Sequence, residues 1–313
     1  MDLQRVAVIG AGYMGGGIAQ TLALAGRHVF IADADAQTSR AAHDRLIEQA
    51  HEYERGGLIE RGGADTITRG LHAASSLEEA AAEADYITEA VPEDLDVKLS
   101  VLGRISGAAR VDAIIGTNTS AIRVSTLASA VTQTLIGVHW FNPAPFVPLV
   151  EITGIDERAL QVVEDLLIQA GKIPVRVPDV PGFLANRLQL ALYREAVAIV
   201  DEGLATPGKV DQIVSNSFGY RLPFFGPFAV GDIAGLDVYV AAYRTLEDHY
   251  GPRFSAPKSL TDRVAKGNLG VKAGGGFLAT NRADRPDLEA YRDRAYVELA
   301  KMRRRIAPRS GDE

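Results

Sequence analysis

Three glycines near the start of the chain have the spacing of a phosphate-binding turn. Gly10, Gly12 and Gly15 form the pattern G-x-G-x-x-G directly after the apolar run 5–9, and a helical pattern follows. In such a turn the first glycine permits the tight bend, the second lets the backbone approach a pyrophosphate, and the third lets the helix pack close to the sheet. This spacing predicts a dinucleotide-binding site at a helix N-terminus.

An acidic residue further along the chain specifies the dinucleotide. Asp33 ends a second apolar run that begins at His28, and it lies about 20 positions beyond Gly12. A carboxylate at this place accepts hydrogen bonds from the ribose hydroxyls and repels a 2′-phosphate, which favours NAD over NADP. We therefore predict NAD as the cofactor, and we count Tyr13 and Met14 of the turn with Asp33 and the three glycines as NAD-binding residues.

Short apolar runs predict the strands that position these residues. The runs are 5–10, 28–33, 86–91, 113–117, 134–138, 148–152 and 172–177, and helical patterns separate most of them. Strands that alternate with helices predict a parallel sheet. A long helical pattern over 182–200 is apolar around much of its circumference, which predicts burial on more than one side. The expected fold class is α/β, a Rossmann doubly wound sheet over 1–181 followed by an all-α C-terminal domain over 182–313.

Composition excludes several classes of protein. Lys and Arg number 33 against 40 Asp and Glu, so the basic excess of a nucleic-acid binder is missing. The chain has no cysteine, which excludes disulfides, thiolate catalysis and zinc-thiolate sites, and we expect no metal. No apolar run reaches the roughly 18 residues of a membrane span, and the first strand begins too early for a signal peptide. We expect a cytoplasmic protein without a nucleic-acid or membrane partner.

Seven motifs follow one another in the order of a known family. They are GAGYMGGGIA at 10–19, EAVPED at 89–94, NTS at 118–120, HWFNP at 139–143, PLVE at 148–151, PGFLANR at 181–187 and KAGGGF at 272–277. Together they resemble the L-3-hydroxyacyl-CoA dehydrogenase family, including its 3-hydroxybutyryl-CoA dehydrogenases, from residue 6 to about residue 279. The resemblance implies an NAD-dependent oxidoreductase of fatty acid metabolism that interconverts 3-hydroxyacyl-CoA and 3-ketoacyl-CoA.

His139 is the predicted catalytic base. It follows the fifth predicted strand, at the carboxyl edge where a doubly wound sheet binds ligands. Oxidation of a secondary alcohol requires a base for the hydroxyl proton, and the unperturbed pKa of histidine lies near neutrality. The resemblance implies that Glu151 orients His139 and supports its imidazolium. A purely structural histidine is the alternative.

The resemblance also implies roles for polar residues around this base. Ser120 and Asn186 match positions that contact the 3-oxygen and the thioester region of the substrate. For Ser120, an N-cap of the segment 122–130 is an alternative or additional role. Four residues match positions that line the cofactor, namely Glu93, Lys98, Asn142 and Lys272. For Glu93 and Lys98, ordinary solvated side chains are the alternative.

Two departures from the family leave the substrate open. Trp140 stands where acyl-CoA enzymes more often carry phenylalanine. The insert between the second and third predicted strands is shorter than the lysine-rich hairpin that grips CoA phosphates, and the first lysine of the chain is Lys98. Arg55, Arg61 and Arg69 either replace those lysines or are ordinary surface arginines. A CoA thioester is the first expectation, and a free 3-hydroxy acid of the gulonate or carnitine type or a carrier-bound acyl group is the second.

Two other functions are disfavoured, and a homodimer is expected. A non-catalytic NAD-binding protein is disfavoured because Ser120, His139, Glu151 and Asn186 are all present. The wider 3-hydroxyacid dehydrogenase group uses a helix-borne lysine, and none occurs here between Pro181 and Lys209. The apolar surface of the 182–200 helix, together with the resemblance, predicts a homodimer with the C-terminal domain as its substrate and dimerisation part.

Overall fold

The computed structural model describes residues 3–279 and 282–306. The chain divides into two compact units, and the division falls between Leu192 and Tyr193. The predicted boundary at residues 181 and 182 lies earlier in the chain and stays a prediction.

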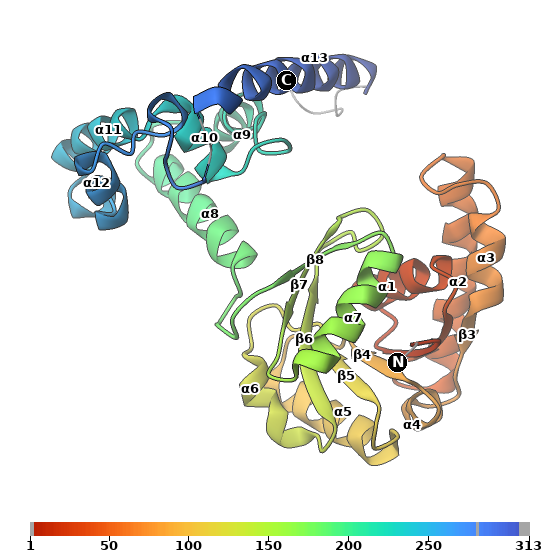
Figure 1. The fold of residues 1–313 in the computed structure, drawn as a ribbon. Helices are drawn as coiled ribbons and strands as arrows, with labels where there is room; N and C mark the ends of the chain where they lie inside the picture. The colour runs from red at the N-terminus through yellow and green to blue at the C-terminus, as the bar shows by residue number, and fades with distance from the viewer. Residues whose placement is uncertain (1–2, 280–281, 307–313) are drawn as a thin grey trace. The chain divides into compact units, whose positions relative to one another are not determined.

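An eight-stranded sheet forms the centre of the first unit (Figure 1). In chain order its strands are β1 (Arg5–Ile9), β2 (His28–Ala32), β3 (Leu71–Ala73), β4 (Tyr86–Glu89), β5 (Ile114–Thr117), β6 (Thr134–Trp140), β7 (Leu149–Thr153) and β8 (Ile173–Arg176). Their order in the sheet is β3-β2-β1-β4-β5-β6-β7-β8, and only the pair β6–β7 is antiparallel within the described residues. The chain adds strands in one direction from β1 to β3 and in the opposite direction from β4 onward. In a doubly wound sheet, the ligand crevice opens at this switch point between β1 and β4. The predicted α/β fold class is confirmed.

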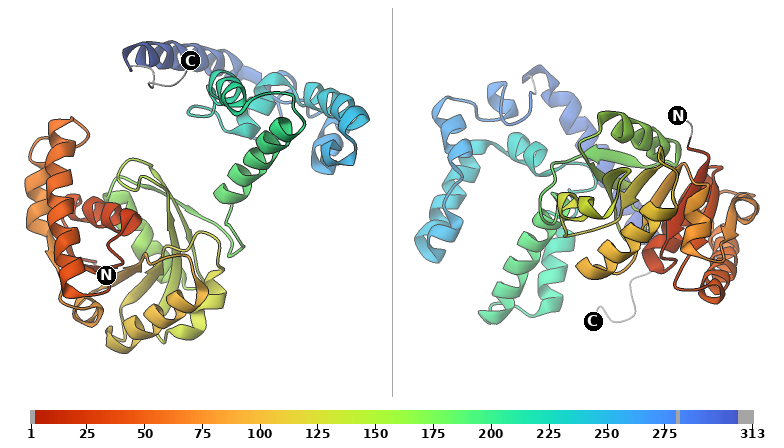
Figure 2. Two further views of the ribbon diagram at one scale, coloured as in Figure 1. Left: turned by 180° about the vertical axis from the view of Figure 1, so that it is seen from behind. Right: turned by 90° about the horizontal axis from the view of Figure 1, so that it is seen from below.

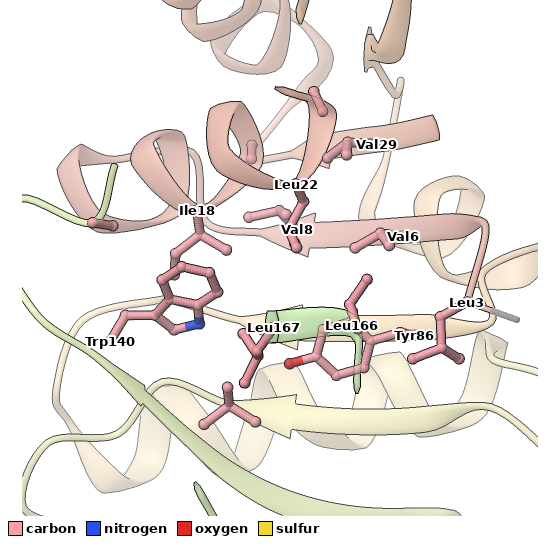
Figure 3. Close-up of a cluster of buried hydrophobic side chains, with 14 of the residues drawn as sticks. Leu3, Val6, Val8, Ile18, Leu22, Val29, Tyr86, Trp140, Leu166 and Leu167 are labelled. Carbon is pink, nitrogen blue, oxygen red and sulfur yellow. The ribbon is translucent and has the colours of Figure 1, made fainter. Parts of the chain in front are cut away.

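Helices cover both faces of this sheet (Figure 2). They are α1 (Tyr13–Leu24), α2 (Ala36–Arg55), α3 (Gly63–Gly70), α4 (Leu77–Ala82), α5 (Leu95–Ala108), α6 (Val124–Leu127) and α7 (Glu157–Gln169). Along β1 the side chains alternate, so that Val6 and Val8 pack with α1, α2 and α7 (Figure 3). Ala7 and Ile9 pack instead with α4 and α5. Burial on both faces explains why the strands read as continuous apolar runs.

Three short elements between β2 and β4 are absent from the expectations. They are α3, β3 and α4, in a stretch that reads mainly as polar. β3 has only three residues and pairs with β2 alone. In addition, β6 extends to Trp140, so His139 lies within a strand and not after it.

A buried lysine fixes the loop between β6 and β7. Lys172 donates from Nζ to the carbonyl oxygens of Ala144, Pro145 and Val147, at 2.6, 3.1 and 3.0 Å. Burial lowers the pKa of Lys172. This anchor sets the loop that follows the strand of His139.

The helix that begins the C-terminal half is exposed. None of the residues of α8 (Ala185–Asp201) is buried in the described chain, and Leu188, Leu190, Tyr193 and Val197 are all exposed. The predicted burial on more than one side is therefore wrong for the single chain. Within the described residues, no helix combines the length and the apolarity needed to cross a membrane.

The second unit continues α8 with further helices. They are α9 (Pro207–Asn216), α10 (Pro227–Ala234), α11 (Leu236–Tyr250), α12 (Lys258–Ala265) and α13 (Arg285–Arg305). Its core gathers Leu236, Val240 and Leu260. The buried carboxylate of Asp232 accepts hydrogen bonds from the N–H groups of Phe277 and Leu278, at 3.0 and 2.8 Å, and so holds the glycine-rich loop before Phe277.

Candidate active site

The glycine turn has the shape that its spacing predicts. Gly10 has φ of +94°, a conformation that favours glycine, and a Cβ on it would lie 2.7 Å from the carbonyl oxygen of Ala90. A Cβ on Gly15 would lie 1.7 Å from the carbonyl oxygen of Gly10. Gly12 is different, because, apart from Gly12 itself, its two chain neighbours and the backbone of its own helix, no heavy atom of the described residues lies within 4 Å of the place its Cβ would take. The turn is thus tightly packed at Gly10 and Gly15, and it has free space at Gly12.

This opening fits a dinucleotide. Gly12 is the N-cap of α1, and no side chain in the described part of the chain caps that helix, so its first N–H groups are available to an anion. Asp33 accepts a hydrogen bond from the N–H of Ala11 at 2.7 Å, which holds its carboxylate beside the turn. The turn and Asp33 would hold the pyrophosphate and the ribose of NAD.

One pocket of about 890 Å³ joins the turn to the predicted catalytic residues, and it lies wholly within the first unit. Its wall includes the carboxyl ends of β1, β4, β5 and β6 and the start of α8. The lining residues that were predicted are Gly10, Gly12, Tyr13, Met14, Asp33, Glu93, Ser120, His139, Asn142 and Asn186. The structure therefore brings most of the predicted site together.

A buried histidine–glutamate pair lies at this pocket. His139 and Glu151 are register partners across the antiparallel pair β6–β7. Nδ1 of His139 lies 2.9 Å from Oε2 of Glu151, and the two side chains are only 5% and 3% exposed. The other carboxylate oxygen of Glu151 accepts hydrogen bonds from the N–H groups of Leu184 and Ala185, each at 3.0 Å. One carboxylate thus fixes both the imidazole and the first turn of α8.

Two aromatic rings enclose the imidazole of His139. Phe183 stacks on it with 5.2 Å between ring centroids, and Phe141 lies at 4.4 Å. Phe183 is 1% exposed and has φ of +47°, which is a strained conformation for an aromatic residue. The stacked ring and the glutamate together leave His139 little freedom to rotate.

The turn that carries Ser120 is held by Glu93. Oε1 of Glu93 accepts hydrogen bonds from the N–H groups of Ser120, Ala121 and Ile122, at 2.9, 2.8 and 3.2 Å. It also accepts one from the Thr119 hydroxyl at 2.6 Å. Burial acts to raise the pKa of Glu93, but the bonds from Thr119 and Ala121 and the charge of Lys98 outweigh it, so the pKa is lowered. Glu93 is therefore an ionised anchor for this turn as well as a wall of the pocket.

Two further contacts settle the place of Ser120. Nδ2 of Asn186 donates to the carbonyl oxygen of Ser120 at 3.0 Å, so the two predicted substrate-contacting residues are joined. The predicted N-cap role of Ser120 is wrong. Helix α6 begins at Val124, and its first N–H groups donate to Asp179 at 2.8 and 2.9 Å.

Lys98 is buried and is not among the residues that line the pocket. Its side chain has no exposed surface, and Nζ lies 2.8 Å from Oε1 of Glu89 and 3.4 Å from Oε2 of Glu93. The solvated side chain that was the alternative for Lys98 is therefore wrong, and its contact with the cofactor stays a prediction. Lys272 belongs to the second unit, where it pairs with Asp237 at 2.6 Å, and its contact with the cofactor stays a prediction.

The sequence analysis did not predict two residues that line the pocket, Asn118 and Gln189, or the buried acid Glu89. Asn118 and Gln189 line the pocket, and Oδ1 of Asn118 accepts a hydrogen bond from the N–H of Trp140 at 2.9 Å, which ties β6 to the end of β5. Glu89 is fully buried at the end of β4. Its only signal in the sequence is an acidic residue inside an apolar run.

Two models of one known protein family match the chain. A family model described as the NAD binding domain of 3-hydroxyacyl-CoA dehydrogenase matches residues 5–180, and one described as the C-terminal domain of the same enzyme matches residues 182–280. The chain belongs to the 3-hydroxyacyl-CoA dehydrogenase family. NAD is its cofactor, and the protein is an NAD-dependent oxidoreductase.

Members of this family with different names resemble the chain to a similar degree. A probable 3-hydroxybutyryl-CoA dehydrogenase from Bacillus subtilis is 34% identical over 88% of this chain and 97% of its own length. An L-carnitine dehydrogenase from a Pseudomonas species is 32% identical over 93% of this chain and 91% of its own length. The crystal structure of a 3-hydroxyacyl-CoA dehydrogenase from Archaeoglobus fulgidus has a TM-score of 0.77 at 30% identity, covering 95% of this chain and 98% of that one.

The two glycines of the turn give a matched pair of variants. In Gly12→Ala the new methyl group enters only the space that fits the cofactor, so we expect an unchanged melting temperature and NADH binding at least tenfold weaker. In Gly15→Ala the methyl group meets the backbone of Gly10, so we expect a loss of about 2–3 kcal/mol in the free energy of unfolding. Fluorescence titration with NADH and denaturant unfolding measure the two effects. Equal behaviour of the variants would contradict the geometry.

Proposed function

We propose that the protein oxidises the 3-hydroxyl of a 3-hydroxyacyl-CoA to a ketone, and reduces the ketone in the reverse direction, with His139 as the base and acid. The single observation that carries this proposal is the buried contact of 2.9 Å between His139 and Glu151 at the pocket that fits NAD. A histidine held by a carboxylate at a hydride-transfer site has the arrangement that alcohol oxidation requires.

The tautomer of His139 follows from its partner. Because the carboxylate of Glu151 accepts a hydrogen bond from Nδ1 of His139, Nδ1 carries the proton and Nε2 is left as the basic atom. In oxidation, Nε2 takes the hydroxyl proton while the hydride leaves carbon 3. NAD, when bound, supplies the hydride acceptor. The carboxylate of Glu151 then stabilises the imidazolium, and the stacked ring of Phe183 favours it as a cation–π partner.

Ser120 and Asn186 have the task of placing the substrate. Both line the pocket, and the bond of 3.0 Å between Nδ2 of Asn186 and the Ser120 carbonyl holds them as one unit. A hydroxyl or amide donor beside carbon 3 polarises the carbonyl and fixes the carbon near the nicotinamide.

The pair His139–Glu151 is tested by two substitutions. We expect His139→Gln to lower kcat at least 1,000-fold, because the proton then has no acceptor. We expect Glu151→Gln to lower kcat about 100-fold, because the amide supports neither the tautomer nor the charge. NADH formation in steady state measures both, and NADH titration shows whether the cofactor site is intact. Full activity of His139→Gln with intact binding would refute this mechanism.

A free 3-hydroxy acid is the second candidate substrate. The hairpin of α2 and α3 carries no lysine, and its arginines at 55, 61 and 69 are all exposed. A relative of similar identity acts, by its name, on L-carnitine. A carrier-bound acyl group is a further possibility with the same chemistry.

A substrate panel separates these candidates. We expect NADH oxidation to proceed fastest with acetoacetyl-CoA or a longer 3-ketoacyl-CoA, and we expect the triple change of Arg55, Arg61 and Arg69 to Glu to raise KM for the thioester about tenfold, because each arginine is an anion ligand. The same variant serves as its own control with free 3-keto acids, for which KM stays unchanged. Faster turnover of the free acids, or an unaltered KM for the thioester, would favour the second candidate.

The exposed face of α8 also bears on the oligomeric state of the enzyme. The apolar side chains exposed along α8 fit a second copy of this chain, so we propose a homodimer that acts in cytoplasmic fatty acid metabolism.

Light scattering at micromolar concentration tests the assembly. We expect twice the chain mass of 33.4 kDa. Replacing Leu188 and Leu190 by Glu should give the monomer, because charges on both surfaces of a self-complementary interface repel, whereas the same change at the exposed Leu58 on the α2–α3 hairpin should not. A stable wild-type monomer would contradict the homodimer.

A further inference from the structure

One polar side chain of the pocket has no role in the proposed reaction. Asn118 follows β5 directly, is half-buried, and lines the pocket together with His139 and Trp140. Within the described residues its side-chain amide makes one hydrogen bond, in which Oδ1 accepts from the N–H of Trp140 at 2.9 Å. The two N–H donors of Nδ2 have no acceptor among those residues, although they belong to a side chain that borders the ligand pocket.

The bond from Trp140 fixes which end of the amide faces the crevice. A backbone N–H can donate only to an oxygen, so the opposite orientation of the amide would bring two donors together. Thr117 pairs with Gly137, which puts Asn118 level with Val138, and Trp140 lies two positions further along β6. The amide thus extends forward from the strand ends, and the donors of Nδ2 lie at the edge where a doubly wound sheet binds ligands.

The order of the pocket residues along the sheet indicates which half of NAD meets these donors. Gly12 follows β1 and Asp33 follows β2, where the pyrophosphate and the adenosine ribose would bind. Asn118 and His139 belong to β5 and β6, on the other side of the switch point. Because hydride transfer takes place beside His139, the nicotinamide half of NAD would occupy this side.

We propose that Nδ2 of Asn118 donates a hydrogen bond to an uncharged oxygen of the nicotinamide–ribose half of NAD, either the carboxamide oxygen or a ribose hydroxyl. The same side chain is bonded to the N–H of the residue that follows His139, so it would fix the cofactor and the base relative to each other. The inference rests on the proposed function only for the role of His139.

A purely structural role for Asn118 is the alternative, because its bond with Trp140 also joins β5 to β6. The backbone N–H of Asn118 already continues the β4–β5 ladder by donating to the carbonyl oxygen of Glu89 at 2.8 Å. For the contact with Trp140 an acceptor oxygen suffices, and the amino group of the amide has no part in it. Substitutions that remove the donors with or without the acceptor therefore distinguish the two roles.

The test compares Asn118→Asp with Asn118→Leu in the full-length protein. Aspartate keeps an oxygen that accepts from Trp140 but removes the donors, whereas leucine removes both. We expect both variants to bind NADH at least tenfold more weakly, and only Asn118→Leu to lower the melting temperature, by about 3 °C, because it leaves an N–H unpaired. Energy transfer to NADH from Trp140, the single tryptophan of the chain, measures binding, and circular dichroism measures melting.

Three ligands identify the acceptor and control for the charge of the new aspartate. ADP carries only the adenosine half and the phosphates, ADP-ribose adds the second ribose, and NADH adds the nicotinamide. We expect the affinity of Asn118→Asp for ADP to change less than threefold. A loss that begins with ADP-ribose supports the inference with a ribose hydroxyl as the acceptor, and a loss confined to NADH supports it with the carboxamide oxygen. An equal loss for all three ligands would indicate repulsion of the phosphates and would overturn the inference.

The matched control for charge is Gln49→Glu. It makes the same change from amide to carboxylate in a neighbouring cleft that shares Gly12 and Tyr13 with the pocket, and we expect its NADH affinity to stay within threefold of the wild type. Unchanged NADH affinity in Asn118→Asp, with a loss confined to Asn118→Leu, would mean that the amide only joins the strands and would overturn the inference.

These binding measurements require no turnover, so they are independent of the proposed function. Activity that survives in His139→Gln would overturn the proposed function and leave the NADH contact of Asn118 in place. Where Asn118→Leu does not fold, Asn118→Asp with its ADP arm and the Gln49→Glu control still decide between the two roles.

Discussion

The site depends first on the hydrogen bonds of one carboxylate, Glu151. Its two oxygens point in different directions, one to His139 and the other to the N–H groups of Leu184 and Ala185. The first bond sets the tautomer of the imidazole, and the other two satisfy N–H groups that the start of a helix leaves without partners. Because Glu151 sits opposite His139 in the β6–β7 pair, the register of that antiparallel ladder decides whether the pair forms at all.

Two other carboxylates bind a neighbouring backbone segment in the same way. Glu93 and Asp179 are carboxylates that accept from backbone N–H groups of a neighbouring segment, just as Glu151 does. Each is placed by a strand end or by the segment that follows a strand, so the rigid sheet sets the position of the loops. Charge-assisted bonds of this kind are stronger than neutral ones, and their loss leaves a buried charge or several N–H groups unpaired. Carboxylates that accept hydrogen bonds from backbone N–H groups therefore hold the loops of the site.

The sequence predicted those parts of the site that depend on local pattern. The glycine turn, Asp33 and seven of the eight strands follow from spacing and apolar runs, because both faces of the sheet are covered and each central strand must be apolar. Strand β3 escaped prediction because three residues, with a histidine in the middle, have too little pattern to read. The burial of Lys98 escaped prediction for a different reason: a lysine beside a strand end looks solvated, and only the tertiary contacts with Glu89 and Glu93 reveal that it is buried.

At the start of the C-terminal half, the sequence pattern does not show to which unit the residues belong. The change from alternating strands to helix occurs at Pro181, yet the contacts of the chain assign residues as far as Leu192 to the first unit. The physical reason lies in three bonds: Leu184 and Ala185 donate to Glu151, and Asn186 donates to Ser120. These bonds attach the first turn of α8 to the sheet, so that Asn186 enters the site from a helix whose other end belongs to the second unit. Sequence pattern marks where the type of secondary structure changes, whereas hydrogen bonds between distant residues decide to which unit a segment belongs.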